Sequence, residues 1–83
     1  MAVIQIDAYQ EIVDFMATPP TLEQMATFRF STKVEARVNE LLYAYRNRRL
    51  NDIEAAELDE FDKLEYVMRV IKLTAREKLE ASQ

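Results

Sequence analysis

The sequence predicts an all-α fold, with short N-terminal helices followed by a long antiparallel αα-hairpin. The chain of 83 residues has no glycine and only two prolines, so it lacks the residue that tight β-hairpin turns usually require. Hydrophobic residues make up 49% of the sequence, which favours a folded chain over a disordered one. Four segments carry hydrophobic residues at helical spacing behind a candidate cap. We therefore expect a single helical domain over residues 1–83.

The first predicted helix covers residues 8–17. Asp7 is a candidate N-cap, and Gln10 stands at the matching capping-box position three residues later. Two consecutive prolines at 19 and 20 end the helix, because proline cannot continue it. The preceding residues 2–6, AVIQI, are rich in β-branched side chains and form either a flexible tail or a short strand.

Two further helices are expected before residue 48. Thr21 and Gln24 form a second capping-box pattern ahead of a short helix over 22–27. Phe28 and Phe30 follow in an extended link, where they either fill a gap between helices or mark a binding hot spot. Ser31 then caps a helix over 32–47, whose predicted apolar stripe consists of Val34, Val38, Leu41, Leu42 and Tyr45.

The fourth predicted helix is the longest. Asn51 and Glu54 form its capping box, and nothing breaks the helical pattern from 52 to about 80. A heptad-like seam runs along it through Phe61, Leu64, Met68, Ile71 and Ala75. We expect an antiparallel hairpin with the third helix around the loop at 48–51, which would place Tyr45 near Ile53.

The difference in length between these two helices leaves part of the fourth uncovered. In an antiparallel hairpin the third helix can cover the fourth only to about residue 68. The rest of the fourth helix therefore needs cover from the first helix, a second copy or another protein. The exposed part carries a second apolar strip of Tyr66, Val67, Val70 and Leu73. This strip is either internal core beneath the first helix or an interface, and a homodimer through the fourth helix is expected.

The residue types argue against catalysis. The absence of histidine and cysteine removes the usual nucleophile–base pairs and the commonest metal ligands, and no glycine-rich phosphate loop exists. We therefore expect no enzyme activity, no cofactor and no metal. No apolar run has the length of a membrane span and the first residues do not resemble a signal peptide, so we expect a cytoplasmic protein without membrane contact.

The charges are segregated along the chain. Residues 52–65 hold seven acidic residues and one lysine, which we interpret as a solvated or partner-facing acidic face. Arg46, Arg48 and Arg49 form a small basic cluster that suits the end of a helix. Three arginines are few for a nucleic-acid footprint, so we expect no nucleic-acid binding by the chain alone. The acidic block favours a basic partner protein.

Several segments resemble one group of small bacterial, often cyanobacterial, proteins that are encoded beside HNH-type nucleases. The similarity covers about residues 12–79 and rests on IVDF at 12–15, a Thr-Pro-rich link at 18–21, FRFS at 28–31, RVNELL at 37–42 and LNDIEAAELDEFDKLEYVMRVIKLTAR at 50–76. Such gene pairs look like type II toxin–antitoxin modules. The resemblance implies that the small acidic protein is the antitoxin and that the nuclease is the toxin.

The resemblance and the residues together give a working hypothesis. The chain would neutralise a cognate nuclease by protein–protein contact. The acidic residues Glu57, Glu60 and Glu65 would face basic nuclease surface, and Tyr66, Val67, Val70 and Leu73 would form the apolar centre of the interface. The alternatives are a structural helical adaptor or homodimer without a nuclease partner and, more weakly, a transcriptional regulator.

Overall fold

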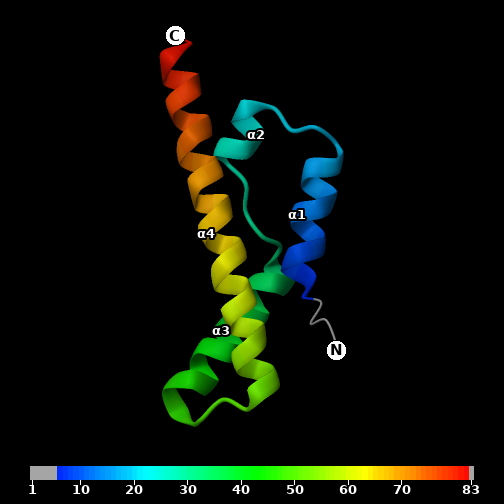
Figure 1. The fold of residues 1–83 in the computed structure, drawn as a ribbon, viewed down its shortest axis with the longest axis vertical. Coiled ribbons are helices and arrows are strands. Elements are labelled where there is room, and N and C mark those ends of the chain that lie inside the picture. The colour runs from blue at the N-terminus through cyan, green and yellow to red at the C-terminus, as the bar shows by residue number, and fades with distance from the viewer. Residues whose placement is uncertain (1–5, 83) are drawn as a thin grey trace.

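The computed structural model describes residues 6–82 and contains four helices in that range, with no strand. They are α1 (Asp7–Ala17), α2 (Leu22–Ala26), α3 (Thr32–Asn47) and α4 (Asp52–Ala81). The molecule measures 49 × 27 × 20 Å, and α4 runs along its full length (Figure 1). The predicted all-α class is confirmed for these residues. The expected tail or strand at 2–6 lies outside them except for Ile6, which is extended.

Three of the four predicted helix starts are confirmed by their cap hydrogen bonds. The Thr21 side chain accepts from the Gln24 backbone N–H, and the Gln24 side chain accepts from the Thr21 N–H. Asn51 and Glu54 make the same reciprocal pair at the start of α4. The Ser31 hydroxyl accepts from the Val34 N–H at 3.2 Å and caps α3. These contacts satisfy backbone donors that a helix start would otherwise leave unpaired.

The start of α1 differs from the prediction. Ile6 occupies the N-cap position and contributes no side-chain cap, whereas Asp7 is the first residue of the helix. Gln10 donates to Asp14 at 2.8 Å and so makes no capping box with Asp7. The Asp7 carboxylate lies 3.2 Å from Lys33 Nζ, and an acid in the first turn suits the helix dipole. Asp7 therefore ties α1 to α3.

The α3 and α4 helices run in opposite directions on either side of the loop at 48–51, and they splay apart toward that loop (Figure 1). Val34 and Leu41 of the predicted stripe are buried. The predicted burial of Leu42 and Tyr45 is wrong, because both are exposed, Tyr45 by 68%. Ala44 is the buried residue at this end of α3. Because the helices diverge toward the loop, only the small Ala44 side chain, on the side of α3 that faces α4, is covered here.

A row of four phenylalanines joins α1 to α4. Ring centroids are 4.7 Å apart for Phe15 and Phe28, 5.1 Å for Phe28 and Phe30, and 5.3 Å for Phe30 and Phe61. Tilted and edge-on rings at these distances are favourable aromatic contacts. The interpretation of Phe28 and Phe30 as residues that fill a gap between helices is confirmed.

The C-terminal half of α4 is covered on one side by α2 (Figure 1). Ala26 and Ala75 are both buried, and the Arg76 guanidinium donates to the Ala26 carbonyl oxygen at 3.5 Å. This cover by α2 was not among the alternatives drawn from the sequence, which were the first helix, a second copy and another protein. Because α2 has only five residues, it covers one side of α4 and leaves the opposite side open.

Candidate functional site

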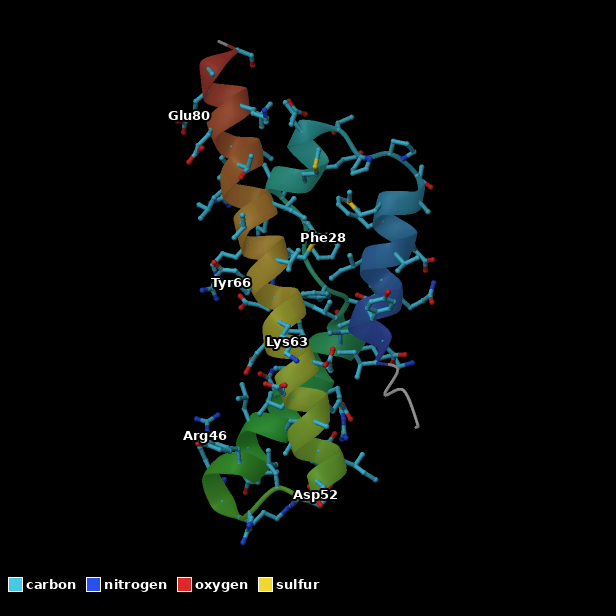
Figure 2. All side chains as sticks on the ribbon, in the orientation of Figure 1. Phe28, Arg46, Asp52, Lys63, Tyr66 and Glu80 are labelled. Carbon is cyan, nitrogen blue, oxygen red and sulfur yellow. The ribbon has the colours of Figure 1, made fainter. Side chains whose placement is uncertain are left out.

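The outer face of α4 carries an uncovered apolar strip. Its four members are substantially exposed: Tyr66 by 63%, Val67 by 49%, Val70 by 45% and Leu73 by 51%. Figure 2 shows Tyr66 on the side of α4 that faces away from α1 and α2. The alternative in which the strip is internal core beneath the first helix is therefore wrong. A cluster of large apolar side chains on the surface is a typical feature of interaction sites.

The position of the strip follows from the two apolar rows of α4. Met68 and Ala75, one heptad apart, are buried against the rest of the molecule. Tyr66, Val70 and Leu73 follow a 4-3 spacing and fall on the opposite side of the helix. The packing of the first row therefore fixes the outward direction of the second.

The three acidic residues predicted to face a partner do not gather on one surface. Glu57 points toward α3, where Arg37 Nε and Nη2 donate to its two carboxylate oxygens at 2.6 and 3.0 Å. Only 18% of the Glu57 side chain is exposed. Glu65 accepts from Arg69 at 2.6 Å and lines a groove beside Phe28. Glu60 is partly exposed and lies 3.4 Å from Lys63 Nζ.

Different charged residues border the strip, and sequence reasoning missed them. Asp59 lies seven residues before Tyr66, and Asp62 lies four before it, so both share its face of the helix. Lys63 lies on the same side of α4, between Asp62 and Tyr66 in the sequence, and its Nζ is 3.3 Å from the Asp59 carboxylate. Glu77 lies seven residues after Val70 at the other end. Heptad spacing was the signal that would have identified most of them, because Lys63 and Glu77 lie seven residues from Val70 and Asp59 lies seven residues from Tyr66.

An apolar groove adjoins the strip along one edge. It has a volume of about 220 Å³ and lies between α2 and α4. Its lining residues are Leu22, Met25, Val70, Ile71, Thr74, Ala75 and Lys78. Val70 belongs to both the groove and the strip, so the two form one continuous apolar surface.

The basic cluster at the end of α3 is largely engaged within the chain. Arg48 donates to both carboxylate oxygens of Glu54, at 2.9 and 2.7 Å. These hydrogen bonds, together with that from the Asn51 backbone N–H, lower the pKa of Glu54 from its usual 4.5 to about 2. Arg46 Nε donates to the Leu42 carbonyl oxygen. Arg48 thus stabilises the loop between α3 and α4.

Two other kinds of site have no suitable arrangement of residues in the part of the chain that the structure describes: a metal site and a membrane-spanning helix. Within residues 6–82, no group of three or more acidic side chains is placed to hold a metal ion. No helix in this range is long and apolar enough to cross a membrane. Every buried side-chain nitrogen or oxygen there has a hydrogen-bond partner. The apolar surface of α4 is therefore the strongest candidate site.

Comparisons of the chain with protein-family models, with curated proteins and with solved structures gave no match.

Proposed function

We propose that this chain is an antitoxin-like protein inhibitor, which binds a cognate HNH-type nuclease through the outer face of α4. The uncovered apolar strip is the observation that carries the proposal. The nuclease as partner comes from the resemblance of residues 12–79 to proteins encoded beside such enzymes. Homodimerisation through the same face belongs to the same proposal.

The strip has the composition of an interface centre. Protein–protein interfaces are apolar and aromatic at the centre and polar at the rim. Here Tyr66, Val70 and Leu73 form the centre, with Asp59 and Asp62 at the N-terminal end. Tyrosine is among the residues most often found at binding hot spots. The surface can therefore bind a protein without any rearrangement of the core.

The charge of the chain suits a basic target. Its net charge is −4, and nuclease surfaces that contact phosphates are basic. Glu60, Asp59 and Asp62 are the acidic residues best placed to steer such a partner, because all three lie at the N-terminal end of the strip. Glu57 contributes less, since Arg37 already neutralises it within the chain, and Lys63 offsets part of the charge of Asp59 and Glu60. Exposed charges mainly accelerate encounter, and the apolar centre mainly slows dissociation.

A matched pair of substitutions tests the proposal. Tyr66 and Tyr43 are the same residue type with similar exposure, 63% and 68%, but Tyr43 lies on α3 outside the strip. We expect Tyr66→Asp to abolish protection of cells that express the neighbouring HNH nuclease, because it places a charge in a desolvated contact. Tyr43→Asp should protect as well as the wild type.

Binding kinetics separate the contributions of the strip and the charges. Val70→Asp should mainly raise the dissociation rate of the purified complex, whereas Asp59→Lys with Glu60→Lys should mainly lower the association rate at low salt. Circular dichroism establishes that each variant stays helical. Full protection by a folded Tyr66→Asp protein would show that the strip is not the inhibitory surface. Failure of the wild-type protein to bind the nuclease would refute the choice of partner.

A further inference from the structure

We propose that a second surface, the groove between α4 and the link that joins α2 to α3, binds an extended segment of a partner protein in which acidic and apolar side chains alternate. This basic groove has a volume of about 300 Å³ and is lined by residues of the link, α3 and α4. Leu73 of the strip forms part of its wall, so the groove adjoins the candidate site. The proposal does not depend on a nuclease partner.

The apolar side of the basic groove comes mainly from the link. Phe28 and Phe30 are partly buried, and the row of phenylalanines holds the link alongside α4 (Figure 1). Met68 of α4 is buried and also lines the groove. Aromatic and thioether side chains provide apolar surface against which a partner's side chain can pack.

The charged side chains of the lining are mostly basic. They comprise four bases and two acids, namely Arg29, Arg69, Lys72, Arg76, Glu35 and Glu65. Both acids are already engaged, because Arg29 and Arg69 each form an ion pair with one of them, at 3.4 and 2.6 Å. Lys72 and Arg76 form no ion pair among residues 6–82. The lining therefore keeps two positive charges in excess.

Lys72 lies at the centre of this unbalanced charge. Its side chain is partly buried, and Arg69 and Arg76 flank it one turn away in each direction. The nearest acids on this side of α4 are Glu65, about 10 Å before Lys72 along the helix axis, and Glu80, about 12 Å after it. Both distances exceed the screening length of about 8 Å at physiological ionic strength. Like charges one turn apart destabilise a helix, so folding alone gives no reason for the cluster.

The helix dipole does not account for these bases either. The dipole favours bases in the last turn of a helix, and α4 ends at Ala81 with Lys78 in that turn. Lys72 lies more than two turns before Ala81, where the effect has faded. An anionic ligand is the arrangement that would balance the charge.

Carboxylates are the anions that fit. Ammonium and guanidinium groups form charge-assisted hydrogen bonds with them. Arg76 uses only Nη2 on the Ala26 carbonyl oxygen, at 3.5 Å, so its other nitrogens can donate to a ligand. A nucleic-acid strand fits less well, because its continuous row of phosphates would also face Glu35 and Glu65.

The dimensions of the basic groove suit an extended segment. The groove follows α4 from Glu65 to Arg76, a length of about 16 Å. Side chains two positions apart in an extended chain point the same way and lie about 7 Å apart, close to the spacing of about 6 Å between residues four apart on a helix. Two alternate acids can therefore reach Lys72 and Arg76 together, and the apolar side chain between them points toward Phe28 of the link.

An NMR titration of the ¹⁵N-labelled chain with the capped peptide acetyl-Glu-Leu-Glu-Leu-Glu-amide tests the proposal. We expect chemical-shift changes at the backbone amides around Phe28, Lys72 and Arg76, with a dissociation constant on the order of 0.1–1 mM because the contact is small. The uncharged peptide acetyl-Gln-Leu-Gln-Leu-Gln-amide should bind about tenfold more weakly, since it cannot form the charge-assisted contacts.

Substitutions locate the binding on the chain, and circular dichroism checks that each variant stays helical. Lys72→Glu with Arg76→Glu should weaken binding of the acidic peptide by more than about tenfold. Because Arg76 also contacts α2, Lys72→Gln provides a second variant with an expected loss of about threefold, and Lys72→Arg should bind as the wild type does. The matched control is Arg46→Glu with Arg49→Glu, which changes the net charge equally at the end of α3 and should leave binding intact.

Four results would overturn the proposal. They are equal binding of the acidic and uncharged peptides, equal losses in the two double variants, no shift changes at several millimolar acidic peptide, and tighter binding of a ten-nucleotide oligothymidylate, which would identify phosphate as the ligand. Tyr66→Ala should bind the acidic peptide as the wild type does, because Tyr66 lies outside the basic groove. None of these measurements involves a nuclease, so their failure is distinct from failure of the proposed function.

Discussion

The guanidinium of Arg37 binds the carboxylate of Glu57 through two hydrogen bonds and thereby joins α3 to α4. Glu57 is largely covered, and this contact raises the pKa of Arg37. The two-pronged geometry of the pair fixes the relative position of the helices more closely than a single contact would.

Removal of one member of this pair should destabilise the fold. We expect Arg37→Ala to lower the free energy of unfolding by about 1–2 kcal/mol, because it leaves the covered Glu57 carboxylate without its main donor. Thermal denaturation should show a decrease of several degrees. Glu65→Gln, which breaks an exposed pair within α4, should cost less than about 0.5 kcal/mol. Equal effects of the two changes would contradict the role assigned to Arg37.

Acid should destabilise the loop between α3 and α4 through Glu54. The pKa of Glu54 is about 2 in the folded chain, below its usual 4.5, so the unfolded chain binds more protons between these values. The contribution of Glu54 to stability is therefore fully present above pH 4.5 and is lost as the pH falls toward 2. Denaturation curves measured across this range should show a shallower loss of stability for Glu54→Gln, which keeps a capping side chain but cannot titrate. Parallel pH profiles for the two proteins would rule this contribution out.

The row of phenylalanines should be critical for stability. Phe28 touches both Phe15 and Phe30, so Phe28→Ala interrupts the contact between α1 and α4 in the middle. We expect a loss of about 2–4 kcal/mol, since the change removes apolar contacts and leaves a cavity. Phe28→Leu should recover much of this loss. Chemical denaturation measures both variants, and an Ala variant as stable as the wild type would show that the row does not hold the helices together.

Ser31 has two roles, and its counterpart Thr21 shares only the first of them, the capping of a helix. Its hydroxyl caps α3, and its backbone N–H and hydroxyl also donate to Glu11 of α1. Ser31→Ala should therefore cost more than Thr21→Ala, with about 1 kcal/mol expected for loss of a cap alone. Comparison of the two melting temperatures tests the difference. A larger effect at Thr21 would show that the link to Glu11 contributes little.

Local signals in the sequence predicted most of the helices. The capping pairs Thr21–Gln24 and Asn51–Glu54 involve residues three positions apart, so their geometry is decided within a single turn. The bounds of α3 agree with the prediction for the same reason, because Ser31 caps it directly.

Contacts between distant residues were not predictable in this way. Arg37 and Glu57 are 20 positions apart, and nothing in their immediate neighbours distinguishes this pair from other combinations of charges. The same holds for the cover on α4, which the five-residue α2 supplies and which the sequence analysis had left open between the first helix, a second copy and another protein. For the candidate site, the strip was visible as a spacing pattern. The sequence did not show which acidic residues lie beside the strip, because that depends on which side of α4 the rest of the chain covers.

The contact between α2 and α4 joins parts of the chain that are separated by 50 positions, as the bond from Arg76 to Ala26 illustrates. Closing so long a loop has an entropic cost, which this contact offsets because α2 packs against α4 more extensively than α1 or α3 does. During synthesis, this contact cannot form until α4 has been completed. In the finished protein α2 should open transiently, because a helix of five residues has few internal hydrogen bonds, so amide hydrogens of Leu22–Ala26 should exchange with solvent earlier than those around Leu41. The turns of α4 beneath α2 would then be uncovered on two sides at once, and proteases would find their first access in this part of the molecule.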